Sequence, residues 1–331
     1  MAAKKRAVVI FNLGGPDSPE AIQPFLFNLF NDPAIISVPN PLRWLIAKVI
    51  SSRRAPVAKE IYAKIGGRSP IVPETEHQAE ALRLRLDAET EGWEHHVFIS
   101  MRYWHPMADE TAQKVQAFAP DEIVLLPLYP QYSTTTTATG FDAWDKTVEK
   151  YQLTVPTRRI TSYPDEPGWV QAQVNLINTA LDATLKDDKQ QDLRILFSAH
   201  GLPKKTVAKG DPYPDQIEVG VKAVMDSLGS ARADWQICYQ SRVGPLEWIG
   251  PSLDNALKKA AGDGVGVLVV PIAFVSEHSE TLVELDIEYR QIAAELGIKT
   301  YCRVPVVGVE KSFIDGLARL VLSDSDEEKV G

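Results

Sequence analysis

The sequence predicts an α/β protein built from two similar domains, each a parallel sheet flanked by helices. Two observations lead to this fold class. First, short apolar and β-branched runs alternate with longer helical patterns, which is typical of βαβ units on a parallel sheet. Second, the two halves repeat each other: VVIFNLGGP resembles RILFSAHGLP, and IVLLPLYPQYSTTTT resembles VLVVPIAFVSEHSET.

Five runs are predicted as strands, because near-continuous apolarity fits strands that are covered on both faces. They are AVVIFNL (7–13), HHVFISM (95–101), EIVLLPLY (122–129), RILFSAH (194–200) and VGVLVVPIAFV (265–275). In open parallel sheets, ligands bind beyond the carboxyl ends of the strands. The residues that follow these runs are therefore the places to search for chemistry.

The repeat also sets the predicted domain boundaries. Phe11 precedes Pro127 by 116 positions, whereas Phe197 precedes Pro271 by only 74, so the first domain carries about 40 residues more. Turn formers in RRITSYPDEPGW mark the crossover. The predicted division is a first domain at 1–160 with an apolar insert at 21–71, completed by a C-terminal helix at 309–322, then a second domain at 161–308 and a polar tail at 323–331.

The insert is rich in apolar side chains. Four of them follow one another at helical spacing, namely Leu42, Leu45, Ile46 and Val49. One interpretation is an amphipathic helix that packs this stripe on the core and leaves its basic residues in water. The other is an apolar lip beside a ligand pocket, touching a membrane surface, with Arg53 and Arg54 holding a ligand carboxylate through forked hydrogen bonds. Composition alone does not separate the two.

The composition argues against some classes of protein. The net charge is −9, whereas a nucleic-acid-binding protein needs a basic face to neutralise phosphates. The two cysteines, Cys238 and Cys302, are too few for a disulfide scaffold, so we expect a reducing, cytoplasmic setting. No apolar run approaches the roughly 18 residues of a membrane span, and the first residues show no signal-peptide pattern.

Two predicted strands in particular end in residues capable of chemistry. His200 ends RILFSAH, where an apolar strand has no packing need for an imidazole. A neutral imidazole with a pKa near roughly 6.5 can accept protons and bind a borderline metal. The strand HHVFISM is followed by Arg102, Tyr103 and His105, to which we assign no firm role.

The stretch SEHSETLVELDIEY, after the last predicted strand, places five carboxylates around His278. Thr281 and Glu284 fit a capping box, which predicts a helix that begins near Glu280. Glu280, Glu284 and Glu288 follow at i, i+4 and i+8, opposite an apolar stripe, which indicates a solvated face. If the helix begins inside a cleft, the same three carboxylates form an acidic path that carries a cation inward or protons outward. The pattern leaves both interpretations open.

Taken together, the longer motifs resemble the ferrochelatases, which insert Fe²⁺ into a porphyrin at the end of haem synthesis. The resemblance covers nearly the whole chain, with its motifs in the right order. They are NLGGPDSPEAIQPFL, IYAKIGGRSPI, MRYWHP, PLYPQYSTTTTATG, LFSAHGLPKKTVAKGDPYPDQI, CYQSRVGPLEWIGPSLD and PIAFVSEHSETLVELDIEY. It implies two similar Rossmann-like domains with the active cleft between them.

By position, the resemblance also implies residue roles. His200 and Glu280 would face each other as the catalytic and metal-binding pair. The residues of the adjoining acidic path would be His278, Glu284 and Glu288. The residues that contact the porphyrin would be Arg53, Arg54, Tyr62, Ser69 and Trp248, although a tryptophan considered alone is more often part of the core.

The substrates implied by the resemblance are protoporphyrin IX and Fe²⁺, with no further cofactor. Some relatives hold a [2Fe–2S] cluster on cysteines of a C-terminal extension, but no cysteine follows Cys302 here, so we predict no cluster. The long apolar insert favours protoporphyrin over coproporphyrin III. The alternatives are a coproporphyrin III ferrochelatase, another tetrapyrrole chelatase, and a non-catalytic tetrapyrrole carrier, which would not need the acidic path. We expect a cytoplasmic protein whose lip contacts the inner face of the membrane.

Overall fold

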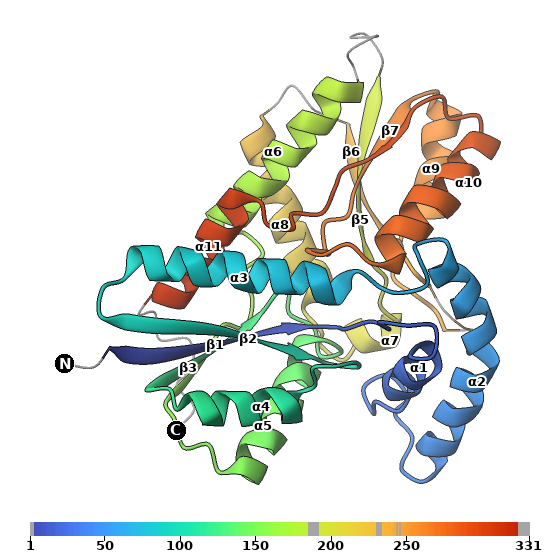
Figure 1. Ribbon diagram of the computed structural model, residues 1–331. Helices are drawn as coiled ribbons and strands as arrows, with labels where there is room; N and C mark the ends of the chain where they lie inside the picture. Colours follow the sequence, from blue (N-terminus) through green and yellow to red (C-terminus); the bar gives the residue numbers. More distant parts are fainter. Residues whose placement is uncertain (1–2, 185–191, 230–233, 243, 245, 324–331) are drawn as a thin grey trace. The chain divides into compact units, whose positions relative to one another are not determined.

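The computed structural model describes residues 3–184, 192–229, 234–242, 244 and 246–323, and it contains two parallel sheets of four strands each (Figure 1). By its internal contacts the chain divides into unit 1, residues 1–162 with 317–331, and unit 2, residues 163–316. Two parallel sheets flanked by helices confirm the predicted fold class. Of the predicted polar tail, only Ser323 lies within the described residues.

The sheet of unit 1 has the strand order β2-β1-β3-β4, and every pairing is parallel. The strands are β1 (Lys4–Asn12), β2 (Trp93–Met101), β3 (Glu122–Pro127) and β4 (Thr157–Arg159). Residues 7–10 of β1 are fully buried, because helices cover both faces of a central parallel strand. The predicted strand at 122–129 ends earlier, at Pro127, which has no N–H to donate.

The helices of unit 1 between β1 and β4 are α1 (Ile22–Phe30), α2 (Leu42–Ala63), α3 (Ile71–Glu89), α4 (Ala108–Phe118) and α5 (Thr137–Tyr151). Of these, α3, α4 and α5 pack on the sheet. On the side of α4 and α5, the ring of Phe11 makes edge-to-face contacts with Phe141 at 5.6 Å and with Trp144 at 6.2 Å between centroids. At the far end of the chain, Arg158 of β4 donates to the carbonyl oxygens of Leu320 and Val321 in α11 (Lys311–Leu322).

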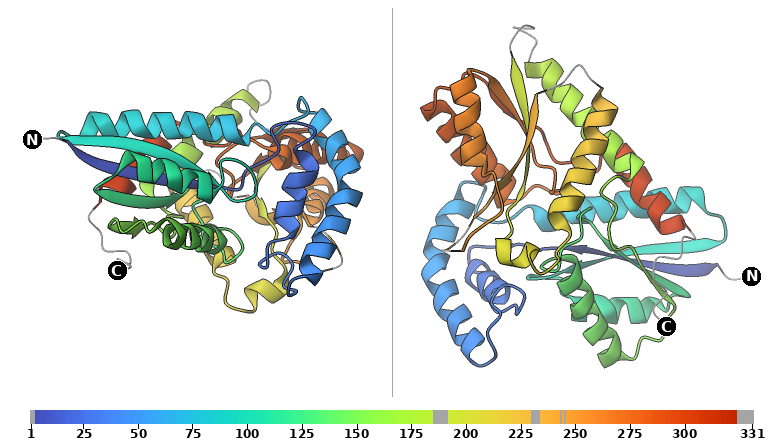
Figure 2. Two further views of the ribbon diagram at one scale, coloured as in Figure 1. Left: turned by 60° about the horizontal axis from the view of Figure 1, so that its bottom comes forward. Right: turned by 180° about the vertical axis from the view of Figure 1, so that it is seen from behind.

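Helices α1 and α2 form the predicted insert and lie side by side (Figures 1 and 2). The predicted apolar stripe does not pack on the core, because Leu42 and Leu45 are each 53% exposed and Val49 is 41% exposed. The docked-stripe interpretation is therefore wrong. Helix α2 instead buries three small residues, Ala47, Ser51 and Ala55, and also Tyr62. Small side chains let the two helix backbones approach closely, which leaves the larger apolar residues on the outside.

The sheet of unit 2 has the order β6-β5-β7-β8, again with parallel pairings only. Its strands are β5 (Leu193–His200), β6 (Trp235–Gln240), β7 (Gly266–Val270) and β8 (Tyr301–Arg303). Its helices are α6 (Pro167–Thr184), α7 (Lys204–Val207), α8 (Tyr213–Leu228), α9 (Leu253–Asp263), the π-helix η1 (Glu280–Tyr289) and α10 (Arg290–Glu295). As in unit 1, the strand predicted at 265–275 ends early, just before Pro271.

The two sheets share one topology, with β5 to β8 in the places of β1 to β4. The backbone bonds give the register of the repeat. The residue after Pro127 donates to the carbonyl of Phe11, and the residue after Pro271 donates to that of Ser198. Phe11 thus corresponds to Ser198, and the predicted match of Phe11 with Phe197 is wrong by one residue.

The second strands of the two sheets match in the same way. Met101 forms a parallel β-bridge with Met107, and the N–H of Met101 donates to the carbonyl of Pro106. Tyr239 forms the same bridge with Ser252 and donates to the carbonyl of Pro251. Met101 therefore corresponds to Tyr239, and the next residues, Arg102 and Gln240, correspond as well.

Within the described part of the chain, no helix has both the length and the apolarity needed to cross a membrane.

Candidate active site in unit 2

The centre of the site is one carboxylate held between two imidazoles. His200 ends β5, and Glu280 begins η1, which follows the neighbouring strand β7. Nε2 of His200 lies 3.7 Å from Oε1 of Glu280, and Nε2 of His278 lies 3.5 Å from Oε2. The sheet thus brings together the two residues that the resemblance pairs, because parallel strands end at one edge.

Both rings turn the same nitrogen towards Glu280. Nδ1 of His200 lies 2.6 Å from the carbonyl oxygen of Gly201, and Nδ1 of His278 lies 3.1 Å from that of Ser276. A carbonyl oxygen only accepts hydrogen bonds, so each Nδ1 carries the hydrogen. Each Nε2 is then a lone pair when its ring is neutral and an N–H when it is charged. The atoms that exchange protons are therefore those that face the carboxylate.

Two carboxyl groups of η1 have pKa values shifted in opposite directions. Burial opposes the ionisation of Glu280, but the charges of His200 and His278, with hydrogen bonds from His278 and Ser241, outweigh it and lower its pKa to about 2. Burial and the negative charge of Glu280 raise the pKa of Glu284, against hydrogen bonds from Ser241 and Gln240. Glu280 is thus the stable anion, and Glu284 takes up a proton more readily.

Glu284 is fixed by donors at the end of β6. Its Oε1 accepts from the backbone N–H of Ser241 at 2.8 Å, and its Oε2 accepts from the Ser241 hydroxyl at 2.5 Å and from Nε2 of Gln240 at 2.9 Å. Ser241 has a φ of 59°, a left-handed conformation uncommon for a residue with a side chain. The buried Gln240 also donates to the carbonyl of Glu280 and accepts from Ser198.

Two expectations for this helix are wrong. There is no capping box, because the Thr281 hydroxyl bonds to the backbone of His278 and Glu284 is engaged by β6. The solvated-face interpretation holds for Glu288, which is exposed, but fails for Glu280 and Glu284. The helix does begin at Glu280, yet as a π-helix, which the α-helical spacing did not foresee. Such segments with i→i+5 bonds occur frequently at functional sites.

The remaining two carboxylates of the acidic stretch are neutralised by a residue that sequence reasoning missed. Arg303 of β8 donates to both oxygens of Asp286, at 2.9 and 2.6 Å, and to Glu277 at 2.7 Å. Its side chain is only 8% exposed. The strand that carries Arg303, β8, was not predicted, so nothing in the sequence pattern indicated this pairing.

Trp248, a predicted porphyrin contact, lies beside His200. Its ring centroid is 6.4 Å from that of His200, and its residue is partly buried. Gly201 makes this approach possible, since a Cβ there would lie 3.1 Å from the carbonyl oxygen of Gln240 and 3.2 Å from the Trp248 ring. The indole Nε1 is buried and has no hydrogen-bond partner among the described residues.

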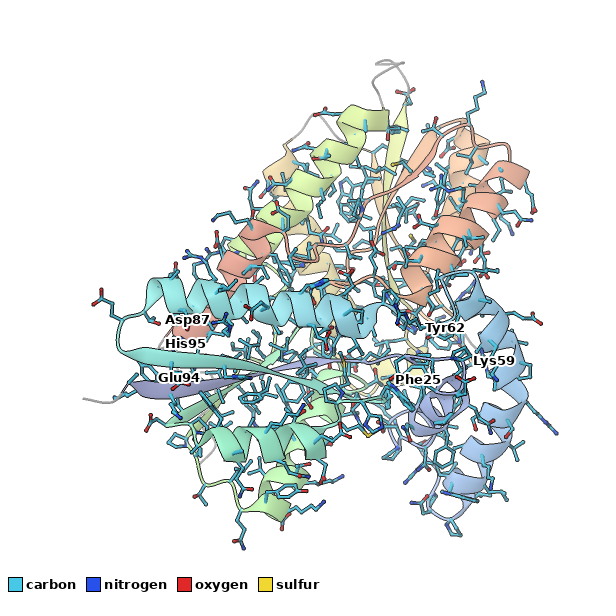
Figure 3. All side chains as sticks on the ribbon, in the orientation of Figure 1. Phe25, Lys59, Tyr62, Asp87, Glu94 and His95 are labelled. Atoms are coloured by element: carbon cyan, nitrogen blue, oxygen red, sulfur yellow. The ribbon has the colours of Figure 1, made fainter. Side chains whose placement is uncertain are left out.

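The other predicted porphyrin contacts belong to unit 1. Arg53 and Arg54 are exposed on α2, and the guanidinium of Arg54 lies 5.8 Å from the ring centroid of Phe30. Tyr62 is buried and packs with Phe25 (Figure 3). Ser69 is buried too, and its N–H donates to the carbonyl of Pro16 at 2.7 Å. Their contacts with a porphyrin remain a prediction.

Among the residues that the structure describes, no three histidine, cysteine, aspartate or glutamate side chains form a group suited to enclose a metal ion. His200 and Glu280 nevertheless stay accessible, with 38% and 30% of their side chains exposed.

Comparisons with known proteins identify the family of the chain. The sequence profile of the ferrochelatase family matches residues 5–325. The ferrochelatase of Phenylobacterium zucineum is 52% identical over 97% of this chain and 92% of its own length. That of Caulobacter vibrioides is 51% identical over 96% of this chain and 90% of its own length.

The fold is found in solved chelatase structures as well. SirB from Bacillus subtilis, solved with Fe³⁺, superposes with a TM-score of 0.54 over 96% of this chain and 94% of its own, at 10% identity, which concerns the fold alone. With the family profile and relatives at about half identity, the resemblance seen in the motifs is confirmed: the chain belongs to the ferrochelatase family and is a metal-chelatase enzyme of haem synthesis.

Proposed function

We propose that this chain inserts Fe²⁺ into protoporphyrin IX to form protohaem, with His200 as the base and Glu280 as the carboxylate that meets the metal. The observation that carries the proposal is the Glu280 carboxylate between the Nε2 atoms of His200 and His278, at 3.7 and 3.5 Å. This arrangement supplies a proton acceptor, an anion and a second imidazole at one accessible place.

The reaction releases two protons, because both pyrrole N–H groups of the free base must lose theirs as the metal enters. In its neutral form, His200 accepts the first proton at Nε2. The imidazolium that results is stabilised by the Glu280 anion. The second proton leaves along the acidic path, for which the raised pKa of Glu284 suits it as acceptor and the exposed Glu288 as the outlet to water.

The metal is a substrate here, so it must be bound and then given up. An imidazole lone pair and a carboxylate oxygen are both ligands for a borderline dication. Glu280 and His200 replace water molecules of the Fe²⁺ ion one at a time, which lowers the cost of removing its hydration shell. Because Nε2 of His200 has one lone pair, His200 leaves the ion before it accepts a proton. Two protein ligands hold the ion less firmly than a closed site would.

The porphyrin is a flat apolar disc with a charged edge. We assign its carboxylates to Arg53 and Arg54, supported by Tyr62 and Ser69, and one face of the ring to Trp248. Arg53 and Arg54 are exposed on α2, next to exposed apolar side chains of the same helix. Binding a buckled macrocycle would expose the nitrogen lone pairs to the metal, with the remote contacts offsetting the distortion.

The test is insertion of Fe²⁺ or Zn²⁺ into protoporphyrin IX by purified protein, followed as the loss of the free-base absorption bands. His200→Ala and Glu280→Ala should abolish turnover and keep the circular dichroism of the folded protein. His77→Gln, on an exposed position of α3, serves as the control histidine. A near-normal rate in either site variant would show that the residue assignment is wrong.

The same assay decides the substrate. We expect a higher kcat/KM for protoporphyrin IX than for coproporphyrin III, because the exposed apolar residues of α2 suit the less polar macrocycle. The reverse order would make the chain a coproporphyrin III ferrochelatase.

Location and further cofactors are proposals of the same kind. We propose a cytoplasmic enzyme, without an iron–sulfur cluster, that touches the membrane through Leu42, Leu45 and Val49, the exposed stripe of α2. Liposome flotation tests the contact: Leu45→Glu should reduce flotation, and absence of flotation by the unchanged protein would remove the membrane from the proposal. Iron analysis of protein purified without oxygen tests the cluster.

A further inference from the structure

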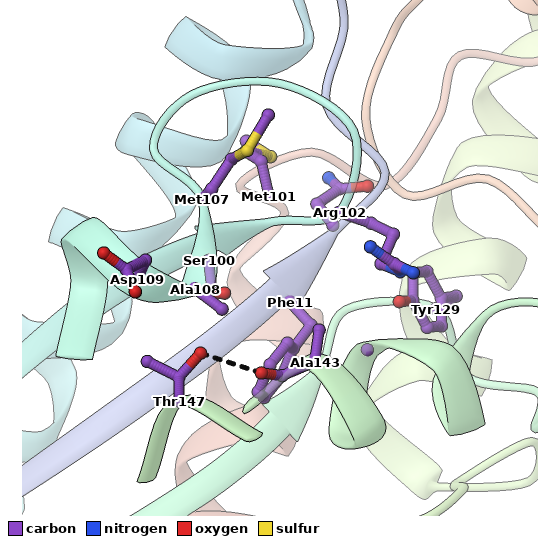
Figure 4. Close-up of a pocket in the computed structure, with 12 residues that line it drawn as sticks. Phe11, Ser100, Met101, Arg102, Met107, Ala108, Asp109, Tyr129, Ala143 and Thr147 are labelled. Carbon is purple, nitrogen blue, oxygen red and sulfur yellow. Dashed lines mark hydrogen bonds between the residues drawn. The ribbon is translucent and has the colours of Figure 1, made fainter. Parts of the chain in front are cut away.

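Unit 1 contains a cavity of about 200 Å³ at the carboxyl ends of β1 and β2, which we name the Gly140 cavity (Figure 4). The side chains and backbone that line it include Phe11, Ser100, Met101, Met107, Tyr129 and Gly140. None of these residues belongs to the active site proposed in unit 2. The cavity therefore needs an explanation of its own.

The internal repeat indicates what is missing there. Gly140 lies 13 residues after Pro127, and Glu284 lies 13 residues after Pro271, the matching strand-ending proline. A Cβ on Gly140 would lie 3.5 Å from the Phe11 ring and 3.7 Å from the Tyr129 hydroxyl, so this position faces the cavity. At this position unit 2 has the carboxylate of Glu284, whereas unit 1 has Gly140 and the cavity beside it.

The hydrogen-bond donors around that space are still present. In unit 2, Gln240 donates to Glu284, and its counterpart in unit 1 is Arg102. Nε of Arg102 is buried and has no hydrogen-bond partner among the described residues. Ser100, which is 3% exposed, and Tyr129 also line the cavity, and each carries a hydroxyl group. A buried donor without a partner, such as Nε of Arg102, is costly and points to an acceptor that is not observed.

Nearby negative charges do not prevent an acceptor from binding. Asp32 is already paired with the guanidinium of Arg102 at 2.5 Å and with the Tyr103 hydroxyl at 3.0 Å. Asp109, at the other end of the cavity, is paired with Lys150 at 2.5 Å. Two further polar residues line the cavity, and both are engaged elsewhere. The amide of Asn12 donates to Thr75 and accepts from the N–H of Leu13, and the Thr147 hydroxyl donates to the carbonyl of Ala143 (Figure 4).

We propose that the Gly140 cavity binds a small free carboxylate, of the size of acetate or propionate, whose oxygens accept hydrogen bonds from Arg102, Ser100 and Tyr129. The ligand's carboxylate takes the place that the Glu284 side chain fills in unit 2. A volume of about 200 Å³ equals roughly six or seven water molecules at ~30 Å³ each. That admits propionate with its methyl group against Met101 and Met107, but not a whole porphyrin.

The four methionines of the chain allow a direct test, because Met101 and Met107 line the cavity, whereas Met1 and Met225 do not. In protein labelled with ¹³C at the methionine methyl groups, sodium propionate should shift the Met101 and Met107 signals saturably, with a midpoint in the millimolar range. The Met225 signal should stay in place. Sodium chloride at equal ionic strength and neutral 1-propanol are the control additions.

Matched variants locate the donors. Arg102→Lys keeps the charge that pairs with Asp32 but moves the donor, and Ser100→Ala removes one hydroxyl, so each should weaken binding several-fold. Gly140→Glu should abolish it by restoring the carboxylate within the chain. Thr147→Val removes a hydroxyl that is already engaged and should leave binding unchanged. If Gly140→Glu does not fold, the other three variants still decide.

Three results would overturn the proposal: no saturable shift of Met101 or Met107, equal shifts with propanol or chloride, or equal affinities of Arg102→Lys, Ser100→Ala and the unchanged protein. A further arm adds protoporphyrin IX. If it displaces propionate competitively, the cavity takes a side arm of the macrocycle and the proposal of a free acid is also overturned; if it does not, the ligand is a separate small acid, as proposed. No step requires turnover, so the outcome is independent of the proposed function.

Discussion

The carboxyl ends of the two sheets share a backbone plan and differ in chemistry. By backbone register, His200 of unit 2 matches Leu13 of unit 1; counted from the strand-ending prolines, Glu280 matches Thr136 and Glu284 matches Gly140. One end thus carries an imidazole and two carboxylates, each held by neighbouring polar groups, and the other carries an aliphatic side chain and a cavity. The comparison teaches that the topology provides the location, whereas a few substituted positions provide the activity.

The histidines of the two units show the same contrast. His95 of β2 is completely buried, with its Nδ1 at 3.1 Å from Asp87 (Figure 3). His200, at the end of its strand, keeps 38% of its side chain exposed. Burial along a strand makes an imidazole structural, whereas placement at the strand end leaves it free to react.

The largest effect is expected at Glu280. Glu280→Gln keeps the shape of the side chain but removes the anion that lies between His200 and His278, so the rate of metal insertion should fall by about 10²–10⁴-fold. Initial rates of Zn²⁺ insertion measure this. The comparison variant is His105→Gln, since His105 also follows a strand and pairs with a glutamate, Glu110, but lies exposed in unit 1. A comparable loss in His105→Gln would break the distinction between the two ends.

The next effect concerns stability. Arg303→Met should lower the free energy of unfolding by about 3–5 kcal/mol, because Glu277 and Asp286 would be left without their buried counter-charge. Urea denaturation measures it. Arg83→Met in unit 1 is the matched control, because its pairs with Glu80 and Asp87 lie at the surface and contribute about 0–1 kcal/mol. Equal losses would contradict the claim that the acidic stretch depends on Arg303.

A smaller effect is expected at Gly201. Gly201→Ala should destabilise unit 2 by about 1–3 kcal/mol, since the new methyl group meets the backbone carbonyl of Gln240, which cannot move aside easily. Thermal denaturation and the insertion rate should both decrease. Gly262→Ala in α9, where a Cβ meets nothing within 4 Å, should instead be neutral or stabilising by roughly 0.5–1 kcal/mol. A harmless Gly201→Ala would mean that His200 and Trp248 do not need this close approach.

The smallest effect is a pH dependence in unit 1. Burial, with the charge of Arg6, lowers the pKa of His95 below 6.5 despite its contact with Asp87. The unfolded chain therefore binds the proton more readily, so the contribution of neutral His95 to stability is complete above pH 6.5 and decreases as the pH falls below that value. The free energy of unfolding of His95→Gln should change less between pH 7 and pH 5. An unchanged slope would contradict this, and the exposed His77→Gln serves as the control.

Continuous apolar runs made five of the eight strands predictable. The strands missed, β4, β6 and β8, are all edge or near-edge strands with partly exposed residues. Such strands lack the unbroken apolarity that marks a strand covered on both faces. Strands β3 and β7 end earlier than the apolar runs predicted, at Pro127 and just before Pro271. Proline has no N–H to donate to a neighbouring strand, and apolarity alone does not reveal this.

Only part of the site was predictable from the sequence. His200 was a candidate from its place at the end of an apolar strand, the resemblance paired it with Glu280, and their proximity follows from the adjacency of β5 and β7. Ser241, Gln240 and Arg303 were not predicted, because they lie at the ends of other strands, far along the chain from the acidic stretch. Ser241 and Gln240 bond to Glu284, which therefore does not make the local capping bond that the spacing of Thr281 and Glu284 suggested. Arg303 bonds to Asp286.

The sequence by itself determined the fold class, the repeat, the family and the candidate pair His200 and Glu280, because apolar periodicity and long motifs are local properties of the chain. The tertiary structure alone decided which carboxylates are anions and which are neutralised, that α2 turns its apolar stripe outward, and that Gly140 leaves a cavity. These depend on groups brought together by strand order and burial, and the electrostatic free energy of a charge is set by its neighbours in space.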